Sequence, residues 1–120
     1  MCLCVKQSPG DFNQINMPRI AFTMKLMEGK ETEYKKRHDE IWPELVSLLK
    51  KQGIEDYSIF LDEGSGQLFG CLAIAAASQL DRLREEPLMW KWWNYMKDIM
   101  ETKPDGSPAT TPLREVFYLA

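Results

Sequence analysis

The only histidine of the chain, His38, is the side chain whose type best fits proton transfer near neutral pH. Tyr34 precedes it by four residues, so the two side chains would lie one turn apart on the same face of a helix. Such a pair can present an imidazole and a phenol to one ligand, which is typical of acid–base catalysis. On helical periodicity alone, the charged residues around His38 favour a different interpretation, a histidine on a solvent-facing helix.

Three tryptophans close together, Trp90, Trp92 and Trp93, form the second unusual feature. Neighbouring helical residues point about 100° apart, so Trp92 and Trp93 do not both face a core squarely. The better core stripe has helical spacing and comprises Met89, Trp93, Met96 and Met100. That stripe leaves Trp92 at its edge, where a flat indole could stack on a sugar ring. The alternative is that these aromatic residues only fill a small core, and Tyr57 is open to the same two interpretations.

Metal and nucleotide motifs are missing from the sequence. The cysteines are Cys2, Cys4 and Cys71, and zinc sites need Cys or His pairs at a spacing that these residues do not provide. No glycine pattern of a phosphate-binding loop occurs either. We therefore expect neither a metal ion nor a cofactor.

The composition excludes several other classes of protein. The chain has 120 residues, 44% of them hydrophobic and 28% charged, which is typical of one globular domain. A formal net charge of −3 argues against binding nucleic acid through bulk positive charge. The apolar runs are too short to span a membrane and no signal peptide is recognisable, so we expect a cytoplasmic protein.

The chain divides into an irregular start, residues 1–16, and a patterned domain, residues 17–120. The first part is rich in turn-forming residues, which predicts a flexible extension. Apolar periodicity in the second part predicts strands at residues 19–27, 57–61, 68–75 and 113–119 and helices at residues 28–52, 77–86 and 88–101. Pro43 should break the first helix near Trp42, and Ser78 is a candidate N-cap of the second helix.

This order of elements predicts an α+β, ferredoxin-like fold, β-α-β-β-α-β, with a four-stranded antiparallel sheet and helices on one face. The strand at residues 68–75 is apolar on both sides, because Leu68 and Leu72 point one way while Phe69 and Cys71 point the other. A sheet that is covered on one face only should alternate apolar and polar residues. We therefore expect a second copy of the sheet to cover the other face in a two-fold homodimer.

Four sequence blocks together resemble the L-rhamnose mutarotase family. They are residues 34–45 (YKKRHDEIWPEL), 53–62 (GIEDYSIFLD), 92–100 (WWNYMKDIM) and 115–119 (EVFYL). The resemblance implies a homodimeric ferredoxin-like α/β barrel that holds a sugar against its sheet. It also implies that His38 is the catalytic proton donor and that four aromatic residues bind the sugar, namely Tyr34, Tyr57, Trp92 and Trp93. Residues 1–16 lie outside the resemblance, and Trp90 is not part of the motif.

The implied activity is that of an isomerase, which interconverts the α and β anomers of L-rhamnose. The ring oxygen must gain a proton while the anomeric hydroxyl loses one, and this chemistry requires neither a metal nor a cofactor. We expect His38 to donate to the ring oxygen, with water, Tyr34 or a carboxylate such as Glu115 taking the other proton. Two alternatives stay open, a cofactor-independent monooxygenase with the same dimeric barrel and a non-catalytic sugar-binding regulatory module.

Overall fold

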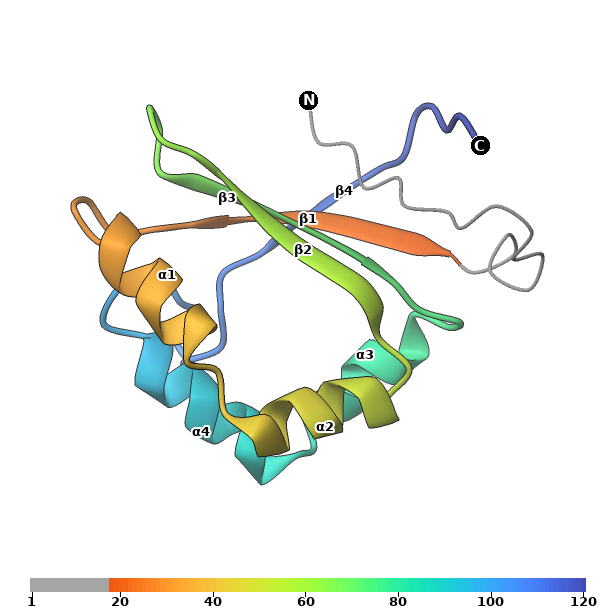
Figure 1. Ribbon diagram of the computed structural model, residues 1–120, viewed down its shortest axis with the longest axis horizontal. Helices are drawn as coiled ribbons and strands as arrows, with labels where there is room; N and C mark the ends of the chain where they lie inside the picture. The colour runs from red at the N-terminus through yellow and green to blue at the C-terminus, as the bar shows by residue number, and fades with distance from the viewer. Residues whose placement is uncertain (1–17) are drawn as a thin grey trace.

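Four strands form one antiparallel sheet in the computed structural model, which describes residues 18–120. The strands are β1 (Arg19–Lys25), β2 (Glu55–Asp62), β3 (Gln67–Ala73) and β4 (Thr111–Leu113), in the spatial order β2-β3-β1-β4. The helices are α1 (Glu31–Asp39), α2 (Pro43–Lys51), α3 (Ser78–Leu83) and α4 (Pro87–Met96). All of them cover the same face of the sheet (Figure 1). The predicted ferredoxin-like fold is therefore confirmed, whereas the extension expected at residues 1–16 lies outside the described residues.

The first crossover is split into α1 and α2 at the predicted proline. Pro43 is the first residue of α2, a position where its missing N–H leaves no hydrogen bond unmade. Trp42 before it is extended, with φ −64° and ψ 130°, as the residue before a proline prefers. The chain therefore turns shortly after His38, which lies in the last turn of α1.

The second crossover contains shorter helices than the sequence predicted. α3 ends at Leu83 rather than at residue 86, and α4 ends at Met96 rather than at residue 101. The prediction for Ser78 was also wrong, because Ala77 occupies the N-cap position. The chain after α4 pairs with the residues at the end of β1, where the Met27 N–H donates to the Ile99 carbonyl and the Glu101 N–H to the Lys25 carbonyl, both at 2.9 Å. None of the helices within residues 18–120 is long and apolar enough to cross a membrane.

The last strand also differs from the prediction. It spans Thr111–Leu113, where it pairs with residues 21–23 of β1, and residues 114–120 are not in the sheet. The apolar residues of that segment stay exposed, at 81% for Val116, 77% for Phe117 and 71% for Leu119. A strand needs a neighbouring strand for its backbone hydrogen bonds, and no strand of the described residues pairs with this segment.

The two faces of the sheet are both apolar, as the pattern of β3 predicted. Leu68 and Met24 are paired across β3 and β1, lie in the core with the helices, and are 1% and 7% exposed. Phe69 and Phe60 are paired one residue away, so they point to the opposite face. Phe60 is 49% exposed there, and no helix of residues 18–120 covers that face (Figure 1).

Candidate active site

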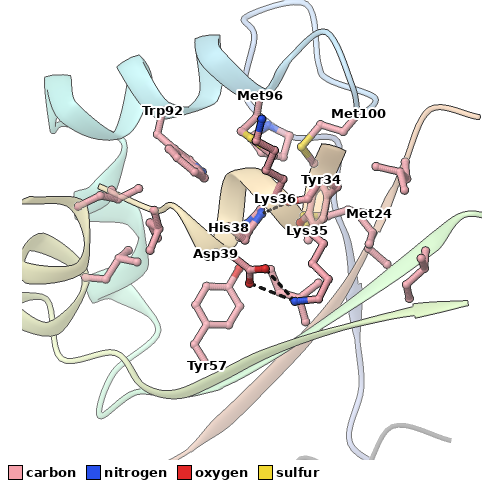
Figure 2. A pocket seen from close by; sticks show the side chains of 18 of the residues that line it. Met24, Tyr34, Lys35, Lys36, His38, Asp39, Tyr57, Trp92, Met96 and Met100 are labelled. Carbon is pink, nitrogen blue, oxygen red and sulfur yellow. Dashed lines mark hydrogen bonds and ion pairs between the residues drawn. The ribbon is translucent and has the colours of Figure 1, made fainter. Parts of the chain in front are cut away.

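A cavity of about 1450 Å³ lies between the sheet and the helices. Its lining includes every residue that was expected at the site, namely His38 and Tyr34 from α1, Tyr57 from β2, and Trp92 and Trp93 from α4. Figure 2 shows His38, Tyr57 and Trp92 reaching the cavity from these three elements. The fold therefore brings together side chains that are far apart in the sequence.

The imidazole of His38 is held in one orientation by its own helix. Nδ1 lies 3.0 Å from the backbone carbonyl of Tyr34, and a carbonyl only accepts hydrogen bonds, so Nδ1 carries a proton. Nε2, on the other side of the ring, makes no hydrogen bond with residues 18–120. Burial lowers the pKa of His38 below its usual value of 6.5, an effect that the Tyr34 carbonyl and Asp39 oppose. At pH 7 the histidine is therefore mostly neutral, with the Nε2 lone pair available to accept a proton.

Two phenols line the same cavity and stay protonated at neutral pH. The ring of Tyr34 lies beside the imidazole of His38, with centroids 4.3 Å apart and planes tilted by 31°. Burial raises the pKa of the Tyr34 hydroxyl far above its usual range, and repulsion from Tyr57 raises it further. Burial also raises the pKa of Tyr57 to about 12, although 40% of this residue is exposed because it borders the open cavity. The two hydroxyls therefore influence each other, and each can donate a hydrogen bond to a ligand.

An irregularity in β2 affects where Tyr57 points. The register between β2 and β3 shifts between Glu55 and Ser58, and Asp56 has a positive φ of 49°. Such a bulge turns side chains relative to a regular strand, and bulges are common beside active sites. The ring of Tyr57 meets that of Phe22 at 61°, with centroids 6.4 Å apart. Tyr57 is thus oriented by a backbone feature that the alternating sequence pattern does not reveal.

The two adjacent tryptophans lie differently from the prediction. Trp92, expected at the edge of the core stripe, is 6% exposed and belongs to the core, whereas Trp93 is half-buried. Trp92 packs edge-on against His38, with centroids 5.5 Å apart, and against Trp42 at 5.1 Å. Residues three or four positions apart lie on the same face of a helix, and Met89 precedes Trp92 by three residues and Trp93 by four. Periodicity alone therefore did not show which of the two indoles enters the core. The buried residues of α4 are Met89, Trp92 and Met96.

The sequence did not identify two residues that contribute to the site. Pro108 lines the cavity from the loop between α4 and β4, and no local pattern pointed to it. Trp42 packs against the ring of Trp92, and its place directly before Pro43 was the signal that could have found it. Glu115, one of the candidates for the second proton-transfer group, lies on the exposed segment after β4 and does not line the cavity.

Charged side chains lie at the edge of the cavity. Lys35 and Asp39 both belong to its lining and form an ion pair at 2.9 Å, with side chains that are 77% and 62% exposed (Figure 2). Within residues 18–120, no group of three or more His, Cys, Asp or Glu side chains could hold a metal ion. The groups that the cavity presents to a ligand are therefore an imidazole, two phenols and two indoles, with charges at the rim.

The chain is similar in sequence to proteins named L-rhamnose mutarotase. Residues 19–119 match the family model with that description. The L-rhamnose mutarotase of Flavobacterium johnsoniae is 59% identical over 104 residues, which cover 87% of this chain and 97% of that protein. The L-rhamnose mutarotase of Agrobacterium fabrum is 56% identical over 106 residues, which cover 86% of this chain and 99% of that protein.

Two solved structures are similar to the chain in fold. The crystal structure of L-rhamnose mutarotase from Formosa agariphila matches with a TM-score of 0.79 and 45% identity, covering 86% of this chain and 99% of that one. A Nitrosomonas europaea protein named as an antibiotic biosynthesis monooxygenase matches with a TM-score of 0.58 and 10% identity, covering 85% and 92%. At that low identity, the second likeness shows the fold alone.

Proposed function

This chain belongs to the L-rhamnose mutarotase family, and we propose that it interconverts the α and β anomers of L-rhamnose. The observation that carries the proposal is the cavity that an oriented, mostly neutral His38 shares with two protonated phenols, Tyr34 and Tyr57. Anomer exchange needs one group that removes a proton and another that supplies one, at the two oxygens bonded to C1. The cavity offers both kinds of group, so the proposed enzyme is an isomerase.

His38 acts first as the base in this proposal. Nε2 accepts the proton of the anomeric hydroxyl while Nδ1 keeps its hydrogen bond to the Tyr34 carbonyl. The electron pair of the broken O–H bond forms the C1=O double bond, and the bond between C1 and the ring oxygen breaks. This direction is the reverse of the sequence-based expectation, in which His38 donated to the ring oxygen. The lowered pKa of His38 supports the reversal, because most of the imidazole carries no proton on Nε2 at pH 7.

A phenol supplies the second proton. The ring oxygen takes a proton from Tyr34 or Tyr57 as its bond to C1 breaks, and the raised pKa values of both hydroxyls keep them protonated beforehand. Rotation about the C1–C2 bond then presents the other face of the aldehyde. On reclosure the ring oxygen returns its proton to the phenolate and the imidazolium returns its proton to the anomeric oxygen. The enzyme regains its starting state, and nothing is oxidised or transferred to another molecule.

Trp92 and Trp93 bind the sugar in this proposal. Indole rings offer flat apolar surfaces on which the C–H faces of a sugar can stack. Trp93 is half-buried and Trp92 closes the wall of the cavity beside His38, which supports contact with both rings. The methyl group of a 6-deoxy sugar adds apolar surface that suits such a wall.

Saturation-transfer NMR on the anomeric protons of L-rhamnose tests the proposed activity. The exchange rate should rise linearly with enzyme concentration, without added metal or nucleotide. His38→Asn should lower the rate by about 10²–10⁴ and keep some sugar binding, whereas Lys97→Gln, at an exposed position, should leave it unchanged. Binding of L-rhamnose without faster exchange would support a non-catalytic sugar-binding module instead. Oxygen uptake with a quinol substrate would support the monooxygenase.

We also propose that two copies pair through the face of the sheet that no helix of residues 18–120 covers. The support is the apolar surface on that face. Phe60 of β2 and Leu113 of β4 point to it from neighbouring rows of paired residues and are 49% and 42% exposed. The apolar residues of the segment after β4 are exposed as well. Apolar side chains that are exposed together on one face are typical of an interface. The proposal also includes the division of the chain into one catalytic domain, residues 17–120, and a dispensable start, residues 1–16. The family match, which begins at residue 19, supports this division. A cytoplasmic location stays a prediction.

A further inference from the structure

Two side chains, Trp90 of α4 and Arg84 at the end of α3, contact the ring of Trp93. The ring of Trp90 meets that of Trp93 edge to face, with centroids 4.7 Å apart and planes at 85°. The guanidinium carbon of Arg84 lies 5.2 Å from the centre of the Trp90 ring and 5.8 Å from that of Trp93. The indole N–H of Trp90 donates to the backbone carbonyl of Arg84 at 2.6 Å. Because each group contacts both others, the Trp93 ring is held from two sides.

The same arginine reaches the loop that follows α4. Its Nη2 lies 2.8 Å from Oδ2 of Asp105, and both side chains are 44% exposed. Oδ1 of Asp105 accepts hydrogen bonds from the N–H of Ser107 at 2.9 Å and from its hydroxyl at 2.6 Å. Ser107 is 1% exposed and directly precedes Pro108, which lines the cavity. A continuous series of contacts therefore links two lining residues, Trp93 and Pro108, through Arg84 and Asp105.

We propose that Arg84, Trp90 and Asp105, here called the arginine clamp, are positioning residues that determine sugar specificity. The clamp holds Trp93 and Pro108 as a rigid apolar wall of the cavity, which accepts the C6 methyl group of a deoxyhexose and disfavours a hydroxymethyl group. This inference rests on the proposed function and adds the origin of its selectivity. Trp90 is the clamp residue whose substitution tests the proposal most directly. It lies outside the block at residues 92–100 that resembles the mutarotase family, whereas Trp92 and Trp93 belong to that block.

Rigidity is what makes an apolar wall selective. A hydroxyl that is pressed against a fixed apolar surface loses hydrogen bonds to water and gains none from the protein. A wall that can move lets water in beside that hydroxyl and removes the penalty. An apolar pocket rejects an analogue with one additional hydroxyl by about 10²-fold at most. Loss of the clamp should therefore reduce the preference without reversing it.

The test compares anomer exchange of L-rhamnose with that of its 6-hydroxy analogue, L-mannose. Trp90→Phe removes the N–H donor and keeps an aromatic ring, and Asp105→Asn weakens the ion pair with Arg84. Arg84→Gln, alone and combined with Asp105→Asn, shows whether these two residues act through one contact. Arg82→Gln is the matched control, because Arg82 is an exposed arginine of α3 outside the clamp.

We expect the preference for L-rhamnose, as a ratio of kcat/KM values, to fall about threefold to tenfold in Trp90→Phe and in Asp105→Asn. The KM for L-rhamnose should rise more than kcat falls, because His38 is unchanged. The double variant should lose no more preference than the larger single variant, and Arg82→Gln should keep the wild-type ratio.

Two results overturn the clamp proposal while the proposed function stands. One is an unchanged preference in the folded variants, and the other is an equal loss for both sugars, which a merely structural role would produce. If the wild-type protein accelerates the exchange of neither sugar, the proposed function fails and the clamp proposal fails with it. Thermal unfolding verifies that the variants fold, and Asp105→Asn alone decides if Trp90→Phe does not fold.

Discussion

Arg37 of α1 and Asp98, two residues beyond α4, form a two-point ion pair. The distances are 2.8 Å from Nη1 to Oδ1 and 3.2 Å from Nη2 to Oδ2. The same guanidinium donates to the Tyr95 carbonyl at 2.7 Å and lies 4.5 Å from the centre of the Tyr95 ring. Arg37 directly precedes His38, and Tyr95 follows Trp92 on α4, so these contacts hold together the two helices whose side chains meet at the site.

Arg37→Gln should lower the free energy of unfolding by about 1–2 kcal/mol, because it removes charge-assisted hydrogen bonds from a side chain that is only 12% exposed. Urea denaturation measures this change. Lys35→Gln is the control, since its ion pair with Asp39 is exposed at both ends and should contribute less than about 0.5 kcal/mol. Equal losses in the two variants would contradict the role given to Arg37.

The pH dependence of anomer exchange distinguishes a base from an acid at His38. Burial lowers the pKa of His38 below 6.5, so a base mechanism predicts a rate that is level at high pH and falls as the pH drops through the lowered pKa. A rate that instead falls as the pH rises through this range would show that the protonated imidazole is the active form. Enzyme-catalysed exchange measured from pH 4.5 to about 9 covers both outcomes.

Protonation of His38 also changes the free energy of unfolding, in a direction that its lowered pKa determines. Below about pH 6.5 the unfolded chain protonates its histidine before the folded chain does, so stability falls as the pH decreases from there toward the folded pKa. His38→Asn should remove this part of the pH dependence. Urea denaturation of the wild type and the variant at pH 7 and 5 measures it, and parallel losses in the two proteins would refute the assignment.

The two adjacent tryptophans should differ in their contribution to stability. Trp92→Ala removes a core ring that is 6% exposed and should cost about 3–5 kcal/mol. Trp93→Ala removes a half-buried ring and should cost about 1–2 kcal/mol while weakening sugar binding. Denaturation midpoints and sugar titrations of both variants test this, and a larger loss of stability in Trp93→Ala would contradict it.

Gly70 allows the ring of Phe22 to lie across β3. A Cβ atom at position 70 would come within 2.6 Å of the Phe22 ring, so Gly70→Ala must displace that ring. We expect a loss of about 1–3 kcal/mol in stability and weaker sugar binding, because Phe22 contacts Tyr57. The added Phe22→Leu substitution should restore part of the stability. Gly64→Ala is the control, because its nearest contact would be at 3.5 Å in an exposed turn.

Sedimentation at micromolar concentration tests the proposed pairing of two copies. The wild-type protein should sediment as a dimer, because the outer face of the sheet leaves Phe60 and Leu113 partly exposed in a single chain. Phe60→Glu should shift the equilibrium toward monomer, whereas Glu85→Lys, on the helical side, should not. A wild-type monomer at this concentration would rule out the pairing.

Local patterns in the sequence predicted the order of the elements and the proximity of Tyr34 and His38. Alternating residues predicted β1 and β2, and Pro43 predicted the break between α1 and α2, because these features depend on the backbone preferences of neighbouring residues. The spacing of Tyr34 and His38 likewise placed the imidazole beside the phenol, since both lie on one helix. The apolar residues on both faces of β3 predicted that something other than the helices, a second copy of the sheet, covers the second face.

The tertiary structure alone decided the features that depend on contacts between distant segments. Trp92 rather than Trp93 enters the core because α4 packs against His38 and Trp42, and helical periodicity allows either residue. Pro108 lines the cavity from the loop after α4, and the ion pair between Asp105 and Arg84 connects this loop to the end of α3. The segment after β4 has the pattern of a strand, yet no described strand pairs with it. The physical reason is the same in each case: a local pattern specifies which face is apolar, and only packing specifies which surface meets that face.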